Sequence, residues 1–381
     1  MTIDPFTIAV PESELADLKD RLARTRWPSE IADSNWQYGT DLAYLQQLCA
    51  YWRDTFDWRA QERYLNQWPQ FLATVDGYRV HFVHARGKGP NPFPLVFTHG
   101  WPGSFFEAHK ILPLLTDPGA HGGDPADSFD VIAPSLPGYG FSEIPITGGY
   151  GQGKTARLWD GLMQQLGYSR YGAQGGDWGA LVTRNLGALF PERVAGIHMN
   201  MMIGGRPASQ DPSQLSDEDK AAMEQGRQWQ EDEAGYQAIQ RTKPQTLAYG
   251  LTDSPVGLAG WIVEKWRTWS DCNGDVESRF TKDEILTNIS IYWHTRTINS
   301  STRYYYEMAH DRQVNFPGGK VEVPTGFAAF PNEIARGQRH WMEPYFNVTH
   351  WTEFDRGGHF PAMEEPELLV GSIREFFRPL R

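Results

Sequence analysis

The segment that most constrains the fold is a short run of small residues around one aspartate, Gly175-Gly176-Asp177-Trp178-Gly179. An extended stretch beginning at Tyr171 predicts a strand that leads into it, and a helical run from Ala180 to Phe190 follows. A strand that turns at once into a helix leaves no room for larger side chains beside the turn. The pattern therefore predicts a sharp strand-to-helix turn with Asp177 at its centre.

This pentapeptide resembles the nucleophile elbow of the α/β-hydrolases, with Asp177 where a serine usually stands. The replacement changes the chemistry, because a carboxylate attacks an sp³ carbon and forms an alkyl ester, whereas a serine attacks a carbonyl. Epoxides and alkyl halides are the substrate classes that such a nucleophile suggests first. A lone Gly-x-Asp-x-Gly is usually an ordinary turn, so the interpretation depends on the rest of the chain.

Composition excludes several classes of function. The 381 residues carry a formal net charge of −12, and the N-terminus has neither a basic region nor a long apolar run. Nucleic acids and anionic membranes both require basic patches, so neither is an expected partner. Cys49 and Cys272 form no CxxC pair, so no disulfide framework and no zinc site is predicted. We expect a soluble, cytoplasmic protein without a secretion signal or a membrane anchor.

Predicted strands and helices alternate along much of the chain. Strands at 94–98, 130–133 and 194–199 are separated by helical stretches near 104–115 and 153–166. This alternation implies a mostly parallel sheet with helices on both faces. The predicted fold class is therefore α/β, with a core of the α/β-hydrolase type.

Four regions follow from this pattern. Residues 1–90 form an N-terminal segment with helical runs that leads into the sheet, and residues 91–202 form the first part of the core. Residues 203–320 are rich in charged residues and helix formers and then in aromatic residues, so a helical insertion is expected there. In α/β-hydrolases an insertion after the sixth strand forms a lid. Residues 321–381 complete the core.

An ester on the nucleophile must be hydrolysed, which requires a base that activates water. His359 lies in a glycine-framed loop after the aromatic stretch 345–354 and is the predicted base. Its carboxylate partner should follow the preceding strand, and Glu333 fits that order. Asp355 is in the same loop as His359, and it is too close to His359 along the chain to reach the far nitrogen of the imidazole. In α/β-hydrolases the acid can also follow the sixth strand, and the residue at that position here is Asn200.

Backbone N–H groups are expected to hold the oxyanion that forms when water attacks the ester. The predicted donors are Trp178, directly after the nucleophile, and Trp101 in the segment HGWPGS at 99–104. The same two tryptophans are the predicted substrate-binding residues, although their indoles could simply form cavity walls.

Several motifs together resemble those of the microsomal-type epoxide hydrolases, in a soluble bacterial form. The similarity covers nearly the whole chain, starting with the N-terminal segment from Phe6 to Pro28. The combination is highly specific, whereas no single motif is. The other matching segments are HGWPGS at 99–104, GGDWGA at 175–180, Asp253–Ala259, Pro324–Phe327 and Arg356–Phe360. Membrane-bound relatives carry an N-terminal anchor, which this sequence lacks.

The resemblance implies that two lid tyrosines polarise the epoxide oxygen. By position these are Tyr236 and Tyr305, although Tyr304, Tyr305 and Tyr306 are consecutive and the choice among them stays open. Without the resemblance, either tyrosine would be an ordinary packing residue.

The implied reaction needs no metal and no organic cofactor. Asp177 attacks a ring carbon while a tyrosine protonates the epoxide oxygen, and an ester forms on Asp177. His359, oriented by Glu333, then activates the water that hydrolyses the ester, and a vicinal diol leaves. The implied partners are a small-molecule epoxide and water. The oligomeric state stays open, and a homo-oligomer is one alternative.

Two other functions remain open. A haloalkane dehalogenase also uses an aspartate followed by a tryptophan, and the indoles of Trp101 and Trp178 could hold the halide. The tyrosine pair favours an epoxide, because an alkoxide leaving group needs an acid and a halide does not. A ligand-binding protein on an inactivated hydrolase fold would have no physical reason to keep a nucleophile, an acid and a base.

Aromatic residues of the predicted lid suggest a sizeable apolar or aryl epoxide. Similar soluble proteins occur in actinobacterial natural-product pathways, including enediyne biosynthesis, and this resemblance suggests an aryl epoxide of antibiotic biosynthesis. The lid residues on which the substrate prediction depends are Trp261, Trp266, Trp269, Tyr292 and Trp293.

Overall fold

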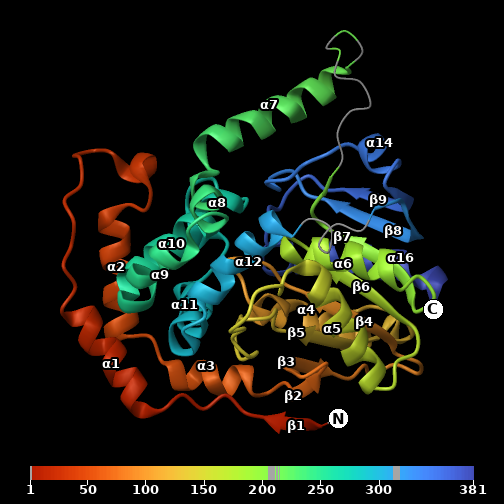
Figure 1. The fold of residues 1–381 in the computed structure, drawn as a ribbon, viewed down its shortest axis with the longest axis horizontal. Helices are drawn as coiled ribbons and strands as arrows, with labels where there is room; N and C mark the ends of the chain where they lie inside the picture. The colour runs from red at the N-terminus through yellow and green to blue at the C-terminus, as the bar shows by residue number, and fades with distance from the viewer. Residues whose placement is uncertain (1, 205–210, 212, 214, 312–317) are drawn as a thin grey trace.

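The computed structural model describes residues 2–204, 211, 213, 215–311 and 318–381. Nine strands form one sheet in the order β1-β2-β3-β5-β4-β6-β7-β8-β9 (Figure 1). Pairing is antiparallel from β1 through β3 to β5 and parallel between all later neighbours. The strands are β1 Ile3–Phe6, β2 Gln70–Val75, β3 Tyr78–Ala85, β4 Phe93–Thr98, β5 Phe129–Pro134, β6 Tyr171–Gly175, β7 Val194–Met199, β8 Val321–Ala329 and β9 Phe346–Glu353.

Helices cover both faces of this sheet, which confirms the predicted α/β class. On β7, the side chain of Ile197 lies against Gly187 of α6 (Trp178–Leu189), whereas Gly196 lies against Phe376 of α16 (Pro366–Phe377). Successive residues of a strand point to opposite faces, so α6 and α16 cover opposite sides. The remaining core helices are α4 Ile111–Thr116, α5 Gln152–Gln165, α14 Arg339–Met342 and α15 Pro361–Glu364.

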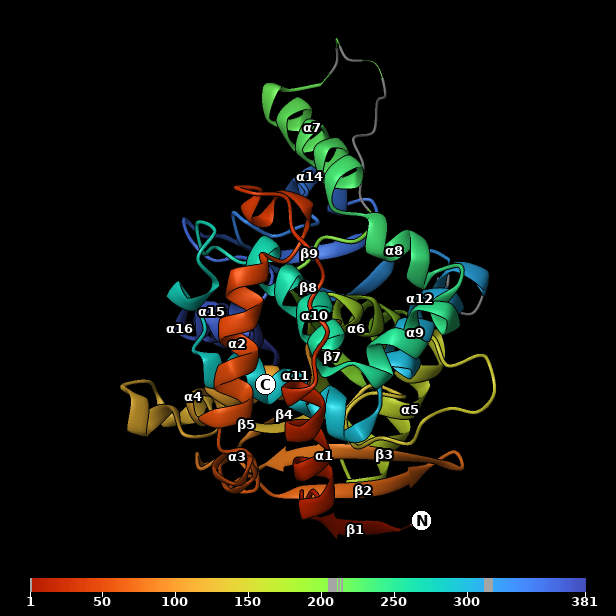
Figure 2. The same cartoon turned by 90° about the vertical axis from the view of Figure 1, so that its left-hand side faces the viewer.

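The chain between β7 and β8 is helical within its described part, and residues 205–210, 212, 214 and 312–317 of the predicted insertion lie outside that part. Figures 1 and 2 show α8 to α12 grouped beside the sheet, with α7 projecting away from them. These helices are α7 Asp217–Asp232, α8 Gly235–Gln240, α9 Pro244–Asp253, α10 Pro255–Trp269, α11 Lys282–Thr295 and α12 Ile298–His310.

The N-terminal helices pack on this insertion rather than standing alone (Figure 2). Trp52 of α2 is buried and donates its indole N–H to the hydroxyl of Ser290 in α11 at 3.0 Å. Arg21 of α1 forms an ion pair with Asp253 of α9 at 2.8 Å. The three helices are α1 Glu12–Ala23, α2 Leu42–Asp54 and α3 Trp58–Leu65.

One strand was not predicted from the sequence. Residues Ile3–Phe6 form β1, the edge strand that pairs with β2. The strand contains Pro5, and three of its four residues are exposed, so its sequence lacks the alternation of apolar and polar residues that predicts a strand. An edge strand tolerates proline because one side of it needs no hydrogen-bond donor.

Candidate active site

Asp177 lies between the end of β6 and the start of α6 with φ 48° and ψ −126°, a conformation that non-glycine residues rarely adopt. The turn is as tight as the sequence predicts. A Cβ on Gly175 would lie 2.4 Å from the backbone of Gly179, and one on Gly179 would lie 1.9 Å from the carbonyl oxygen of Thr98. The two glycines therefore allow the turn that holds Asp177 at the end of the strand.

Three candidate residues meet at the carboxyl ends of parallel strands. His359 follows β9 and Glu333 follows β8, and the two are joined by a 2.8 Å contact between Nδ1 and Oε1. Nε2 of His359 lies 3.4 Å from Oδ2 of Asp177. His359 and Glu333 are both buried. The predicted nucleophile, base and acid thus lie in one line, with the imidazole between the two carboxylates.

The alternatives for the acid lie elsewhere. The Asp355 side chain is 87% exposed and its carboxylate lies 3.6 Å from Arg356. Asn200 is buried against Gly176 and accepts a hydrogen bond from Gln174 at 3.0 Å. Neither therefore takes the position that Glu333 occupies next to the imidazole.

The surroundings of His359 determine its charge. Burial by itself lowers the pKa of the imidazole, but the carboxylates of Glu333 and Asp177 outweigh burial and raise the pKa well above its ordinary value. The free site therefore holds an imidazolium between two carboxylates at neutral pH.

The predicted oxyanion donors lie next to the nucleophile. The N–H of Trp101 donates to Oδ1 of Asp177 at 2.8 Å. Trp178 is the first residue of α6, where backbone N–H groups have no partner within the helix. The indole of Trp101 stacks on the ring of Tyr236 with centroids 5.2 Å apart.

A cavity of about 340 Å³ opens over Asp177 and is lined by Tyr236 and Tyr305. Both tyrosines are buried. Burial, reinforced by the charge of Asp177, raises the pKa of both phenols far above the ordinary value, so both keep their protons. A buried phenol of this kind can donate a hydrogen bond to an oxygen held in the cavity.

The structure distinguishes the three consecutive tyrosines. The hydroxyl of Tyr304 lies 2.8 Å from that of Thr155. Tyr306 is exposed and stacks on His310, with ring centroids 3.9 Å apart. Both line a separate cavity of about 370 Å³. Of the three, Tyr305 is the one that shares a cavity with Asp177.

The aromatic residues of the predicted lid on which the substrate prediction depends do not line this cavity. Trp266 and Trp269 are fully buried, and Trp266 packs against Phe280 and Phe360. These two tryptophans pack in the interior instead, and a sequence pattern cannot separate a packed tryptophan from one that lines a binding site. The cavity is lined mainly by Trp178, Leu181, Met201, Trp229, Met308 and Ile334, together with the two tyrosines.

Sequence reasoning also missed a carboxyl group beside the nucleophile. Glu107 lines an enclosed space of about 10 Å³ together with Asp177, His359 and Asn200. Burial raises the pKa of Glu107 to about 8, although the charge of His359 opposes this shift. A space of that size with several polar walls suits about one water molecule. The only sequence signal is that Glu107 follows HGWPGS closely, and an acid in a helical stretch is usually on a solvated face.

The comparisons with known proteins agree with this geometry. Residues 3–108 match the family described as "Epoxide hydrolase N terminus", and residues 94–248 match the family "alpha/beta hydrolase fold". A protein of Stigmatella aurantiaca is 48% identical over 380 residues, covering 100% of this chain and 86% of that protein. Epoxide hydrolase 1 of Oryctolagus cuniculus is 40% identical, with 98% of this chain and 88% of that protein covered. The chain belongs to the epoxide hydrolase family.

Solved structures of epoxide hydrolases share the whole fold. Juvenile hormone epoxide hydrolase from the silkworm Bombyx mori superposes with a TM-score of 0.91 at 30% identity, covering 100% of this chain and 95% of that one. The epoxide hydrolase of Aspergillus niger gives a TM-score of 0.89 at 29% identity, with 100% and 97% covered. The predicted family and the predicted α/β-hydrolase fold are therefore confirmed. Within the described residues, every helix is too short or too polar to cross a bilayer.

Proposed function

We propose that this epoxide hydrolase family member converts an epoxide to a vicinal diol through a covalent ester on Asp177. The observation that supports this most directly is a nucleophile in contact with a buried histidine–glutamate pair, under a cavity lined by two buried, protonated tyrosines. We further propose that helices α7 to α12 act as the lid, because Tyr236 and Tyr305 come from α8 and α12.

Ring opening needs a nucleophile and an acid on opposite sides of the same carbon–oxygen bond. A carboxylate oxygen of Asp177 forms a bond to a ring carbon, and the bond from that carbon to the epoxide oxygen breaks. Tyr236 and Tyr305 hydrogen-bond the departing oxygen, and one of them gives it a proton. The apolar cavity wall strengthens these polar contacts because water is excluded.

Alkylation itself then prepares the base. The ester on Asp177 is neutral, so His359 loses one of the two carboxylates that raise its pKa. The pKa of the imidazole falls, and its proton passes to the tyrosinate that ring opening left behind, so the tyrosine is restored and His359 becomes neutral. His359 is thereby an ion-pair partner before ring opening and a free base after it.

Hydrolysis follows on the same site. Neutral His359, oriented by Glu333, takes a proton from water, and the water oxygen bonds to the ester carbonyl carbon. The N–H groups of Trp101 and Trp178 hold the oxyanion. The tetrahedral intermediate collapses, the carbon–oxygen bond to the diol breaks, and the diol oxygen takes the proton from His359. Asp177 is left as a carboxylic acid, and its proton passes to His359, which restores the imidazolium between two carboxylates. No step draws on a metal or an organic cofactor.

The substrate that suits this site is an uncharged, largely apolar epoxide. The cavity of about 340 Å³ is walled mostly by apolar and aromatic side chains, with Asp177 and the two phenols as its reactive polar groups. An aryl epoxide fits this description, since the rings of Trp178 and Trp229 lie in the wall.

The test is covalent trapping on a variant that forms the ester but cannot hydrolyse it. We would treat His359→Gln with styrene oxide and, separately, with a bromoalkane, and locate any adduct by peptide mass spectrometry. Addition of the whole epoxide mass to the Asp177 peptide is the expected result. An alkyl adduct from the bromide alone would instead indicate a dehalogenase, and an adduct on another residue would exclude Asp177 as the nucleophile.

A further inference from the structure

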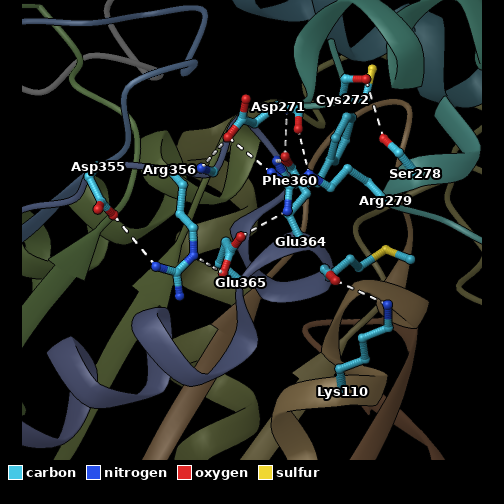
Figure 3. A network of polar contacts seen from close by, with 12 residues as sticks. Lys110, Asp271, Cys272, Ser278, Arg279, Asp355, Arg356, Phe360, Glu364 and Glu365 are labelled. Carbon is cyan, nitrogen blue, oxygen red and sulfur yellow. Dashed lines mark hydrogen bonds and ion pairs between the residues drawn. The ribbon is translucent and has the colours of Figure 1, made fainter. Parts of the chain in front are cut away.

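A buried carboxylate outside the reaction scheme lies directly behind the base. Glu364 ends α15, is 8% exposed, and its two oxygens accept hydrogen bonds from different parts of the chain (Figure 3). Oε1 accepts from the N–H of Phe360 at 2.8 Å, and Oε2 accepts from the N–H of Asp271 at 2.7 Å. One side chain thus joins the residue after His359 to the segment that follows α10.

The loop that carries His359, residues 355–360, is held to that same segment by its own backbone. The N–H of His359 donates to the carbonyl of Trp269 at 2.9 Å, and the N–H of Gly357 donates to Oδ2 of Asp271 at 2.9 Å. The two segments approach so closely that a Cβ on Gly358 would lie 2.7 Å from the Trp269 carbonyl oxygen. We call residues 355–360 the base loop.

The contact is further braced by charged side chains. Arg279 donates to the carbonyl and the carboxylate of Asp271 and forms an ion pair with Glu365 at 3.0 Å. Arg356 of the base loop pairs with Glu365 at 3.0 Å as well (Figure 3). These side chains are partly exposed, so they contribute less than the buried bonds of Glu364.

We propose that Glu364 is a positioning residue that holds the base loop, and through it His359, against the segment after α10. This inference rests on the proposed function, because the position of His359 matters only if it activates water. Nε2 of His359 lies 3.4 Å from Asp177, so a small shift of the base loop takes the imidazole out of reach of the ester. Glu364 therefore adds a buried side-chain link to the backbone bonds that join the base loop to residues 269–271.

The charge state of Glu364 sets the conditions of the test. Burial raises the pKa of Glu364 to about 7, against the opposing effect of its two backbone hydrogen bonds. Above that pH the ionised carboxylate accepts both bonds, whereas an amide presents N–H groups to one of the two donors. Glu364→Gln in alkaline buffer therefore removes one bond with little change of volume.

Glu365→Gln is the matched control, because it breaks the ion pairs with Arg279 and Arg356 but leaves both backbone bonds intact. In single-turnover experiments with styrene oxide, Glu364→Gln should slow ester hydrolysis about tenfold and leave alkylation within about twofold. The ester on Asp177 should accumulate, and Glu365→Gln should behave like the native protein. An equal loss of both steps in Glu364→Gln would overturn the proposal, as would native hydrolysis.

A second measurement needs no substrate. Amide hydrogen exchange should become faster in Glu364→Gln over both the base loop and residues 269–271, and stay unchanged in Glu365→Gln. Faster exchange in only one segment, or in neither, would contradict the coupling. If the native protein forms no ester with any epoxide, the proposed function fails, whereas the exchange experiment still decides whether Glu364 ties the two segments together.

Discussion

At the scale of single residues, the site is organised by charge. His359 lies between two carboxylates, and Asp177 is the one that the proposed reaction neutralises. The raised pKa of His359 is therefore a property of the resting site. Because this pKa is higher in the folded chain than in the unfolded one, its stabilising effect is complete below about pH 6.5 and is lost as pH rises through the folded value.

Asp177→Asn imitates the neutral ester without a substrate, so it should lower the pKa of His359 relative to the native protein. The reason is the loss of one of the two negative charges that favour the imidazolium. NMR titration of labelled histidine measures the shift. An unchanged titration midpoint would mean that Asp177 does not control the base.

Tyr305→Phe removes a phenol hydroxyl from the cavity but keeps the ring. It should slow ring opening about 100-fold, the usual scale for a lost general acid. The matched control is Tyr304→Phe, which loses a bond to Thr155 but faces another cavity. Stopped-flow fluorescence reports the alkylation step, since Trp178 lies 4.5 Å from the Tyr305 ring, centroid to centroid. A larger effect in Tyr304→Phe would reverse the assignment.

Glu107→Ala should slow hydrolysis of the ester about tenfold or more, because it removes a polar wall from the small space beside His359. Glu107→Gln keeps a hydrogen-bonding group there and should retain most of the rate, since burial raises the pKa of the carboxyl to about 8 and so favours its neutral form. Rapid quench followed by mass spectrometry measures the ester directly. Equal rates in both variants would exclude a role for Glu107 in holding water.

At the scale of the elements, the turn between β6 and α6 has little tolerance for change. Gly179→Ala places a Cβ against the carbonyl of Thr98, and backbone on both sides prevents relief. We expect a loss of about 3 kcal/mol or more in the free energy of unfolding, as for severe overpacking.

The control for that variant is Gly250→Ala in α9, where nothing lies within 4 Å of the new Cβ. Alanine is favoured over glycine inside a helix, so this variant should gain up to about 1 kcal/mol. Urea unfolding distinguishes the two. Similar losses of unfolding free energy in Gly179→Ala and Gly250→Ala would show that the crowded turn is not what destabilises Gly179→Ala.

At the scale of the whole molecule, the amino-terminal helices pack on the proposed lid. Trp52→Phe should cost about 1–3 kcal/mol, because it leaves the buried Ser290 hydroxyl without its partner. Thermal unfolding measures this loss. At temperatures where the variant stays folded, ring opening should keep its rate, since Trp52 does not line the cavity over Asp177.

Local patterns predicted much of this architecture, and tertiary packing decided the rest. The glycines around Asp177 predict the turn, because one short segment of the chain contains both the turn and the small residues that it requires. Tyr304, Tyr305 and Tyr306 point in different directions from one helix, so only the neighbouring elements decide which one reaches the cavity. No sequence pattern indicates that Glu107 lies beside Asp177, and none separates the packed Trp266 from a binding residue, because burial depends on segments far away in the sequence.

The packing of α1 and α2 on α9, α10 and α11 has a consequence for engineering. A chimera that takes only residues 203–320 from a relative would bring in a lid whose outer surface no longer matches the first helices of this chain. The exchangeable unit is therefore discontinuous and includes the stretch from α1 to α3 as well. Substrate range in this family should be transplanted as two paired segments, not as one.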